Sequence, residues 1–378
     1  MTALEVTLKT RLKDFMLSLS FEMGDELFAL VGRSGSGKTV VLRSIAGVFV
    51  PDSGSISIRG EPVFSSGRDL TVPPANRFVG YVAQAHQLFP QLTVAENVGF
   101  SLTRRRDQTT TQLNDAERRV GELLELLQLT RIADVFPADL SEIELQRAAL
   151  ARALSLDPEI LLLDDPFATL DSGTRRQARS ELSEMRRLIN VPVLLATSEL
   201  EEAYEIADRI ALIDRGAVLQ VGPPRQLLMR PSSRRVADIV RSVNVIPGTV
   251  IAETGGALDV TTPLGILRVS DLSGIHGEVD VVVRPEHVRL LDRSESIGGG
   301  PVTNVLHGVI TESARHGAIH ALAFKPDDAY HDVELQIFVS DLAYQQLGLA
   351  ADQHRSVELP PRALHLMPRV IDEGRFPS

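Results

Sequence analysis

The chain contains no cysteine among its 378 residues. Disulfide bonds, thiolate zinc sites and cysteine nucleophiles are therefore excluded. The sequence also lacks an uncharged apolar run near the ~20 residues that a membrane-spanning helix needs. Residues 1–21 lack the apolar core of a signal peptide and carry Lys9, Arg11 and Lys13. We therefore expect a cytoplasmic protein, and we expect that any function at a membrane is carried out without insertion into the bilayer.

The chain also has fewer basic than acidic side chains. The 39 Lys and Arg residues face 50 Asp and Glu residues, which gives a formal net charge of -11 and an isoelectric point near 5.4. This balance argues against nucleic acid or an anionic membrane surface as a general partner. The hydrophobic share of 43% and the charged share of 24% are those of an ordinary globular protein. We expect proteins and small molecules as partners, and no nucleic acid.

A glycine-rich loop stands between two apolar segments near the N-terminus. Residues 32–39 read Gly-Arg-Ser-Gly-Ser-Gly-Lys-Thr and fit the pattern G-x-x-x-x-G-K-[ST] at every fixed position. The run 27–31 before the loop is typical of a strand, and 40–45 after it is helix-like. Such a loop points successive backbone N–H groups at one anion, and the helix dipole favours negative charge. A chance Gly/Ser-rich turn is the weaker interpretation. We predict a nucleotide-binding set of Gly32, Arg33, Ser34, Gly35, Ser36, Gly37, Lys38, Thr39 and Val40.

A second landmark is an apolar run, residues 160–163, that ends in Asp164 and Asp165. This pattern is typical of a central parallel strand that delivers a carboxylate to the carboxyl edge of a sheet. With the phosphate loop present, Lys38 is expected at the β- and γ-phosphates, and Thr39 and Asp164 at Mg²⁺. Asp165 is placed to orient or deprotonate the attacking water. Without that loop, a solvated acidic turn would be the better interpretation.

Segments typical of strands and helices alternate along the first two thirds of the chain. Stretches 4–8 and 15–21 alternate apolar and polar residues and predict an antiparallel edge sheet. Residues 88–154 are mostly helical, with a polar surface connection at 104–114. Gln84 ends an apolar strand, where α/β proteins place ligand contacts. We predict a mostly parallel sheet covered on both faces, with further strands at 55–58, 78–82, 160–164, 193–197 and 209–213.

The sequence changes character near Pro231. A helical segment leads into short alternating strands with Gly and Pro between them, which indicates a separate β domain. Residues 244–251 align with 304–311, and Gly-Gly-Gly-Pro at 298–301 separates the copies. Two related small β-barrel units are therefore predicted. No metal is assigned to His316 and His320. The expected domains are 1–235 with a helical part at about 88–154, a connecting helix 236–242, and a β domain 243–370.

These motifs together resemble the ATP-binding subunit of ATP-binding cassette (ABC) importers, over essentially the whole chain. Residues 79–84 followed by 88–98 resemble the family's glutamine loop, which opens the helical subdomain that meets the membrane subunits. Residues 140–154 resemble the signature helix, and 168–171 the loop that crosses the dimer interface. The resemblance implies an α/β P-loop NTPase cassette with a helical subdomain, followed by an all-β, OB-like domain of two repeats.

The resemblance also implies ATP and Mg²⁺ as cofactors, with two copies enclosing two nucleotides. Gln84 would lie at the metal and the attacking water, and Asp165 and Ser198 occupy catalytic positions. Ser141, Glu142 and Asp171 would face the nucleotide of the opposite subunit. The implied partners are integral-membrane permease subunits and a second nucleotide-binding subunit, at the cytoplasmic face of the cell membrane. A binding protein would deliver the solute.

The tail resembles the transport-associated domain of importers for molybdate, sulfate, ferric iron, polyamines or sugars. The N-terminal segment lacks the usual adenine-stacking aromatic, as in molybdate-type members. Molybdate or a similar oxyanion is therefore the favoured solute, ahead of polyamine, iron and sulfate.

Three positions depart from the family pattern. The signature Leu-Ser-Gly-Gly-Gln is replaced by residues 140–144, Leu-Ser-Glu-Ile-Glu, the catalytic Glu by Asp165, and the switch His by Ser198. The S-x-x-E spacing of Ser141 and Glu144 predicts a capping box that closes its own helix terminus. Three alternatives stay open: an importer ATPase, a hydrolysis-poor subunit that pairs with an intact one, and a cassette without a membrane complex.

Overall fold

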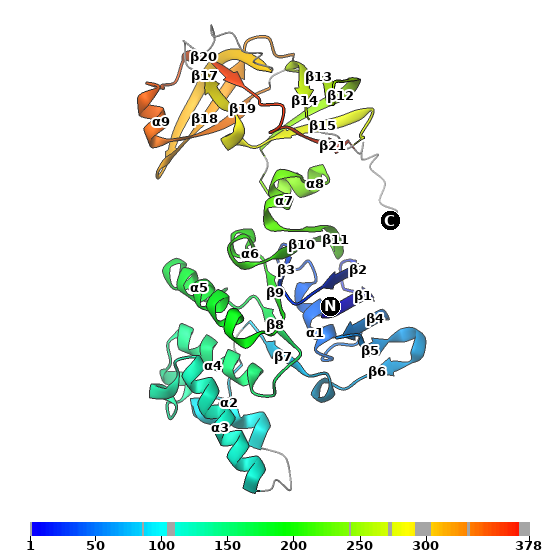
Figure 1. Cartoon of the computed structure of the whole chain (residues 1–378), viewed down its shortest axis with the longest axis vertical. Coiled ribbons are helices and arrows are strands. Elements are labelled where there is room, and N and C mark those ends of the chain that lie inside the picture. Colours follow the sequence, from blue (N-terminus) through cyan, green and yellow to red (C-terminus); the bar gives the residue numbers. More distant parts are fainter. Residues whose placement is uncertain are drawn as a thin grey trace. The chain divides into compact units, whose positions relative to one another are not determined.

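The structure is a computed structural model and describes residues 2–84, 87–103, 110–241, 243–270, 274–291, 304–330 and 333–369 (Figure 1). The chain divides into two compact units, Met1–Pro224 and Arg225–Ser378. Residues 225–235 thus belong to the second unit, whereas the sequence analysis assigned them to the first domain. Two contacts tie residues 231 and 237 to strands of the second unit. His365 Nε2 hydrogen-bonds the Pro231 carbonyl (3.0 Å), and Ala237 packs against strand residues of the second unit.

The first unit is built on a six-stranded sheet in the order β11-β10-β3-β9-β8-β7. Its strands pair in parallel except β10 and β11, which are antiparallel. β3, β8 and β9 are buried along their whole length, as apolar runs covered on both faces require. The predicted mostly parallel sheet is confirmed. Its strands are β3 (Leu27–Val31), β7 (Val79–Val82), β8 (Ile160–Asp164), β9 (Val193–Thr197), β10 (Arg209–Asp214) and β11 (Ala217–Gly222).

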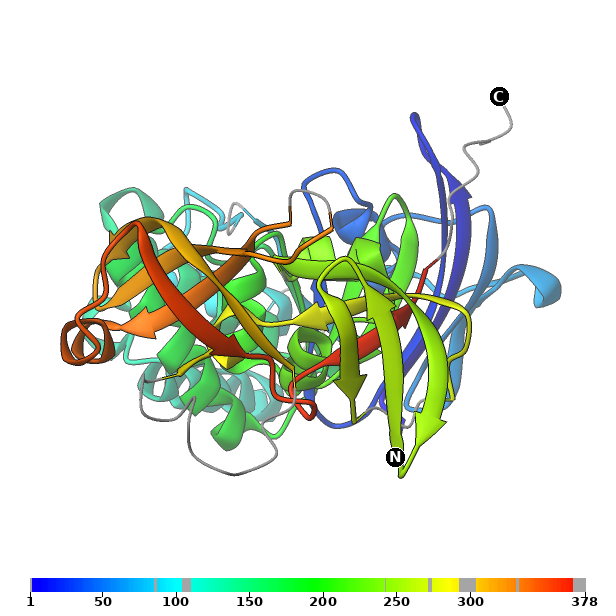
Figure 2. The same ribbon diagram turned by 90° about the horizontal axis from the view of Figure 1, so that it is seen from above.

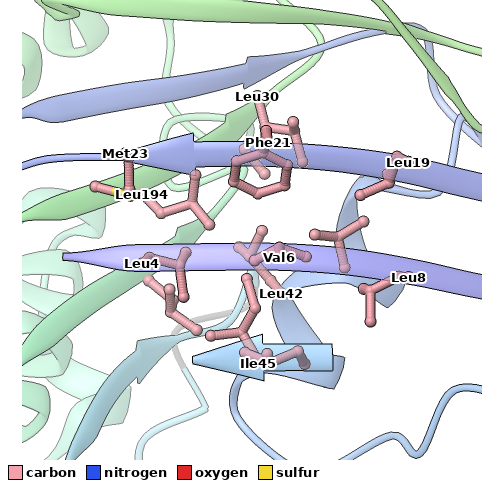
Figure 3. Close-up of a cluster of buried hydrophobic side chains, with 14 of the residues drawn as sticks. Leu4, Val6, Leu8, Leu19, Phe21, Met23, Leu30, Leu42, Ile45 and Leu194 are labelled. Atoms are coloured by element: carbon pink, nitrogen blue, oxygen red, sulfur yellow. The ribbon is translucent and has the colours of Figure 1, made fainter. Parts of the chain in front are cut away.

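A second, antiparallel sheet packs over one face of the parallel sheet, with helix α1 (Lys38–Ile45) between them. Figure 3 shows side chains of β1 and β2 meeting Leu42 and Ile45 of α1 and Leu30 and Leu194 of the parallel sheet. Each fully buried aliphatic side chain of this kind contributes roughly 1.5–3 kcal/mol. The cluster therefore fixes α1, and with it the loop before it. The sheet consists of β1 (Leu4–Arg11), β2 (Met16–Met23), β4 (Ser53–Ile58), β5 (Glu61–Ser65) and β6 (Leu70–Thr71).

Helices cover the opposite face of the parallel sheet and share a second apolar core. They are α2 (Val94–Thr103), α3 (Thr110–Leu126), α4 (Glu142–Leu154), α5 (Ser172–Ile189) and α6 (Leu200–Ile206). Residues 110–114, predicted as part of a surface connection, form the exposed start of α3, and residues 104–109 lie outside the described part. None of the described helices is long and apolar enough to span a bilayer.

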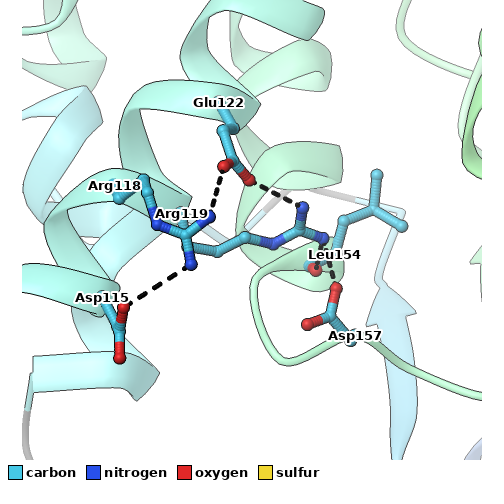
Figure 4. Close-up of polar contacts among 6 residues, drawn as sticks. All are labelled: Asp115, Arg118, Arg119, Glu122, Leu154 and Asp157. Carbon is cyan, nitrogen blue, oxygen red and sulfur yellow. Dashed lines mark hydrogen bonds and ion pairs between the residues drawn. The ribbon is translucent and has the colours of Figure 1, made fainter. Parts of the chain in front are cut away.

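A network of charged side chains ties α3 to the end of α4 (Figure 4). Arg119 donates to the Leu154 carbonyl (3.3 Å) and pairs with the Asp157 carboxylate. On the exposed side of α3, Arg118 pairs with Asp115 and Glu122. The Arg119 contacts therefore link α3 to the end of α4, whereas the Arg118 pairs lie within α3.

Two five-stranded sheets, which lie side by side in both ribbon views, form most of the second unit (Figures 1 and 2). Both contribute to one apolar core. Short helices flank them: α7 (Pro224–Met229), α8 (Arg234–Ile239) and α9 (Asp341–Gln346). The first sheet has the order β14-β13-β12-β15-β21, with β12 (Asn244–Thr254), β13 (Ala257–Thr262), β14 (Gly265–Val269), β15 (Glu278–Val283) and β21 (His365–Pro368). The second has the order β16-β20-β17-β18-β19, with β16 (Arg289–Leu291), β17 (Val305–His316), β18 (Ile319–Pro326), β19 (Leu335–Ser340) and β20 (Gln353–Glu358).

The repeat in the sequence reappears in the sheets. The aligned stretches begin β12 and β17, and the register of these strands shifts at the same point of the repeat, between Val250 and Ala252 and between Ile310 and Glu312. However, β16 precedes the second repeat and joins the second sheet, while β21 comes from the chain's end and joins the first. The repeats therefore form one folded unit with a common core instead of two separate barrels. The spacer 298–301 lies outside the described residues.

The first asparagine of each repeat joins the two halves. Asn244 exchanges two hydrogen bonds of 2.8 Å with the main chain of Gln336 in β19. Asn304 makes the matching pair with the main chain of Arg268 in β14 (2.7 and 2.8 Å) and also donates to the Leu359 carbonyl (2.9 Å). An amide side chain fits this role because it offers a donor and an acceptor side by side.

Candidate functional site

Four parallel strands of the first unit end at one edge of their sheet. Val31 of β3 lies opposite Thr197 of β9, and Ala196 lies opposite Asp164 of β8. The next residues along the chain, Gly32, Ser198 and Asp165, therefore leave the sheet at neighbouring points. Val82 of β7 lies opposite Leu163, so Gln84 follows at the same edge, where it is exposed. The strand order thus gathers the landmarks that the sequence shows far apart.

The glycine-rich loop is curled tightly between β3 and α1. Gly35 and Gly37 have φ values of 82° and 105°, a region open to glycine at little cost. A Cβ added to Gly32 would fall 2.4 Å from the Ile213 carbonyl oxygen, so this position has no room for a side chain. Lys38 Nζ donates to the carbonyls of Gly32 (2.7 Å) and Arg33 (3.2 Å). The ammonium group therefore lies inside the curl of the loop.

The start of α1 is open to an anion. Its N-cap residue Gly37 offers no side-chain cap, and its first turn holds no acidic residue, so these backbone N–H groups have no side-chain acceptor from the cap. The hydroxyl of Ser36 is buried and has no hydrogen-bond partner. Arg33, Ser34 and Gly35 are exposed, and the side chain of Val40 packs against the apolar core. These donors suit a phosphate group.

Asp164 is held from two sides. Its carboxylate is buried, with 4% of the residue exposed, and Oδ1 accepts from the Thr39 hydroxyl (3.0 Å). Oδ2 accepts from the hydroxyl of Tyr81 in β7 (3.1 Å). Burial and the Asp164 charge raise the pKa of Tyr81 to about 12, although Arg43 opposes the rise. Sequence reasoning did not identify Tyr81; its one signal was a polar group in an apolar strand.

Asp165, next along the chain, lies in the left-handed region (φ 50°), and its N–H donates to the Ala196 carbonyl (2.8 Å). Burial raises the pKa of its carboxyl group, and the charge of Asp164 adds to the rise. Lys38 and the backbone N–H of Ser198 act in the opposite direction. Burial lowers the pKa of Lys38, and the charges of Asp165 and Asp164 raise it in part. The structure therefore brings Lys38, Asp164 and Asp165 within electrostatic reach of each other.

Glu202 of α6 is a buried acid near this edge that sequence reasoning missed. The residue is 2% exposed; its Oε2 accepts from the Thr197 hydroxyl (2.6 Å) and its Oε1 lies 3.7 Å from Arg175 Nε. Burial raises its pKa, and the charge of Asp165 adds to this. Arg175 also donates to the Leu170 carbonyl (2.9 Å). No local sequence pattern points to Glu202, because a glutamate in the first turn of a helix is ordinarily solvated.

The remaining predicted residues lie at the starts of α4 and α5. The predicted capping box of α4 is confirmed: Ser141 Oγ accepts from the Glu144 N–H (3.4 Å), and Glu144 Oε2 accepts from the Ser141 N–H (2.8 Å). Hydrogen bonds from Ser141 lower the pKa of Glu144. Glu142 accepts from the Thr169 hydroxyl (3.0 Å).

Asp171 caps α5 in the same manner. Its Oδ1 accepts from the N–H groups of Gly173 (2.9 Å) and Thr174 (3.2 Å). The side chains of Ser141, Glu142 and Asp171 thus bond groups of their own subunit. That they face the nucleotide of a second subunit stays a prediction.

Comparison with known proteins identifies the family. A family model described as ABC transporter matches residues 16–168. The sulfate/thiosulfate import ATP-binding protein CysA of Rhodopseudomonas palustris is 41% identical over 322 residues, which cover 85% of this chain and 86% of the relative. The spermidine/putrescine import ATP-binding protein PotA of Ruegeria pomeroyi is 36% identical over 296 residues, with coverage of 78% and 75%.

One solved structure shows the same fold. The cbiO1 protein of Clostridium perfringens, described as part of the ABC transporter complex cbiONQ, has a TM-score of 0.52 and 23% identity, and the match covers 60% of this chain and 90% of that one. The sequence relatives share much higher identity over most of their length and are all named as import ATP-binding proteins. The chain therefore belongs to the ABC transporter family, as an ATP-binding subunit of the importer type.

Proposed function

We propose that the first unit binds ATP with Mg²⁺ at the loop 32–39 and hydrolyses it to power the import of a small solute. The observation that carries this proposal is the open start of α1. An uncapped helix terminus, a partnerless buried Ser36 hydroxyl and the Lys38 ammonium converge there, beside two carboxylates at the same sheet edge. Backbone N–H donors at a helix start, together with an ammonium group, are suited to binding phosphate groups.

Each residue has a distinct task in this proposal. Lys38 binds the β- and γ-phosphates, and Thr39 and Asp164 hold Mg²⁺, with Gln84 at the same edge. Among the described residues no group of three or more His, Asp or Glu could hold a metal, which suits an ion that enters with the phosphates. Bound Mg²⁺ supplies charge neutralisation. Asp165 orients the attacking water and takes its proton, while Ser198 offers its N–H beside it.

A cleft at the end of β7 is the proposed contact with the membrane permease subunits. It has a volume of about 570 Å³ and is lined by apolar side chains that include Phe78, Phe89 and Phe100. Phe78 is 60% exposed, and Phe89 packs against Phe100 with ring centroids 4.2 Å apart. Arg152 lies over Phe89 and donates to the Gln87 carbonyl (2.8 Å). We assign this cleft to a helix of a permease subunit at the cytoplasmic face of the membrane.

The proposed solute is a small oxyanion. One relative is named for sulfate/thiosulfate import, which supports the oxyanion class, while molybdate stays the more specific prediction. Another relative is named for spermidine and putrescine, so a polyamine is the competing solute. Uptake of labelled sulfate, molybdate and putrescine by the complex of this subunit with its permease and binding protein tests the assignment. Uptake of putrescine alone would overturn it.

A hydrolysis-poor role is the second candidate, and the closed start of α4 favours it. In this version the chain binds ATP but hydrolyses little, and it pairs with another nucleotide-binding subunit whose signature is intact. Steady-state ATP turnover by the purified chain separates the two candidates. Tight Mg²⁺–ATP binding with negligible turnover supports the regulatory role, turnover supports the ATPase role, and a failure to bind ATP overturns both.

A further inference from the structure

We propose that Tyr81 sets the metal preference of this site by occupying one oxygen of Asp164, so that the carboxylate binds a divalent cation through its other oxygen alone. The inference rests on the proposed Mg²⁺–ATP site. It adds a positioning residue that controls which cation the site accepts.

Strand register places the two side chains together. Tyr81 in β7 lies opposite Leu162 in β8, and Asp164 comes two residues later. Side chains two residues apart on a strand share a face, so Tyr81 and Asp164 both lie on the face that α1 covers, where Tyr81 and Leu162 belong to the same apolar cluster. From there the Tyr81 hydroxyl reaches Oδ2 (3.1 Å), while Thr39 in α1 reaches Oδ1 (3.0 Å).

The direction of these hydrogen bonds follows from the chemistry of the groups. An ionised carboxylate can only accept, so the hydroxyls of Tyr81 and Thr39 both donate to Asp164. The guanidinium of Arg43, which also acts on the Tyr81 hydroxyl, can only donate. The hydroxyl hydrogen of Tyr81 is therefore donated to Oδ2 of Asp164. Thr39 keeps its oxygen lone pairs for a cation on the Oδ1 side.

This arrangement favours a small cation over a large one. Mg²⁺ takes an octahedron of oxygens at about 2.0–2.1 Å and is held by one or two carboxylates with phosphates and water, whereas Ca²⁺ accepts more ligands and often binds a carboxylate through both oxygens. With Oδ2 engaged by Tyr81, Asp164 offers Oδ1 to the metal. Loss of the Tyr81 hydroxyl frees Oδ2 and lets the carboxylate turn to bind through both oxygens.

The test is ATP affinity of the full chain in EDTA, in Mg²⁺ and in Ca²⁺, measured by calorimetry for the parent and for Tyr81→Phe. We expect Tyr81→Phe to keep the parent affinity in EDTA. The gain in affinity from Mg²⁺ should fall by about tenfold or more, the range typical when a partner of a metal ligand is lost. The gain from Ca²⁺ should fall less, so the Mg²⁺-to-Ca²⁺ ratio drops. Tyr330→Phe is the matched control, because Tyr330 is 75% exposed and lies in the second unit, and it should match the parent.

Four results would overturn the inference. An unchanged Mg²⁺ gain and Mg²⁺-to-Ca²⁺ ratio in Tyr81→Phe would show that the hydroxyl does not tune the metal. Loss of affinity in EDTA would show a wider structural role. A further loss of metal dependence when Tyr81→Phe is added to Asp164→Asn would show that Tyr81 does not act through Asp164. If the parent itself gains nothing from Mg²⁺, the proposed metal site fails first, and this inference fails with it.

Discussion

The carboxylate of Asp165 stands one methylene closer to the backbone than a glutamate at the same position would place it. Its buried setting and the neighbouring Ser198 N–H keep it at the edge of the phosphate site. A shortfall of about 1 Å toward the attacking water can cost ~100-fold in rate. We expect Asp165→Glu to raise steady-state ATP turnover. Unchanged turnover, in a parent that does hydrolyse ATP, would show that Asp165 is not the base.

Restoration of a histidine at position 198 should reinforce that gain. Both changes act on one transition state, so the effect of Ser198→His should depend on whether residue 165 is Asp or Glu. The measurement is turnover of the parent, the two single variants and the double variant. Strictly multiplicative rates would indicate that the two positions do not share a site.

Lys38→Ala tests the phosphate loop directly. The change removes the positive charge from inside the curl, where Lys38 bonds two carbonyls, but it leaves the backbone donors in place. ATP affinity, measured by calorimetry, should fall heavily, because a charge-assisted contact to the phosphates is lost. A variant that is folded by circular dichroism and binds ATP nearly as well as the parent would contradict the site assignment.

Glu202→Gln should change how stability depends on pH. Burial raises the pKa of Glu202 in the folded state, so this group's contribution is fully present below its unfolded value near 4.5 and is lost as the pH rises through the folded value. A glutamine stays neutral and can still accept from Thr197. Above the ordinary pKa of a glutamate, the thermal midpoint of the first unit should therefore fall less steeply with rising pH in the variant. Parallel curves would rule out titration of Glu202 in this range.

The candidate site residues that could be predicted from the sequence are those that belong to short motifs with a fixed spacing. The loop 32–39 and the pair Asp164 and Asp165 are local patterns, and their chemistry can be inferred from neighbours in the chain. Tyr81 and Glu202 carry no such pattern. Tyr81 reaches Asp164 through strand register and Glu202 reaches Thr197 through helix placement, and both depend on tertiary packing.

At the scale of elements, the contrast between α1 and α4 decides what each helix start can bind. α1 begins at a glycine without a side-chain cap. At the start of α4, by contrast, Ser141 and Glu144 form a capping box and Glu142 accepts a hydrogen bond from Thr169. The pKa of Glu144 is lowered by its bonds to Ser141, so its carboxylate stays charged at neutral pH. An incoming polyanion would meet occupied donors and two negative charges in a poorly screened interface.

The triple change Glu142→Gly, Ile143→Gly, Glu144→Gln should therefore increase ATP-dependent dimerisation, although the altered first turn weakens the start of α4 by ~1 kcal/mol. Light scattering with and without ATP, in a background slowed by Asp165→Asn, measures the effect. Glu125→Gln removes an exposed charge from α3 and serves as the control. If the parent dimerises with ATP as strongly as the triple variant, then the capped helix start is no obstacle to closure.

Helices and strands were predicted best from the sequence where the spacing of apolar residues was regular. The alternation of 4–8 and 15–21 and the apolar runs of β3, β8 and β9 were sufficient to predict strands. The start of α3 at Thr110 was missed because its first residues are polar and exposed. β5, β6 and β11 were not predicted, since these short strands depend on pairing partners more than on their own composition.

At the scale of the whole molecule, the second unit depends on contacts between its two repeats. Asn304 makes three hydrogen bonds to the main chain of Arg268 and Leu359, and each buried polar group left without a partner costs about 1–3 kcal/mol. We expect Asn304→Ala to lower the thermal midpoint of this unit clearly. Gln336→Ala is the control, because Asn244 bonds only the main chain of Gln336. Equal midpoints for the two variants would contradict the structural role of Asn304.

The return of β21 to the first sheet also determines when that sheet can be completed during synthesis. β15 pairs with β21 along residues 279–282, so its outer edge stays unpaired until β21 has been made. The ribosome adds about 5–20 residues per second, so the roughly 80 residues between these strands take ~4–16 s. Throughout that interval the nascent chain presents an apolar strand with an open edge, which other chains can pair with. The nascent chain is therefore open to strand pairing with other chains until β21 has been made, and a stop or slow stretch of translation after β15 prolongs that exposure.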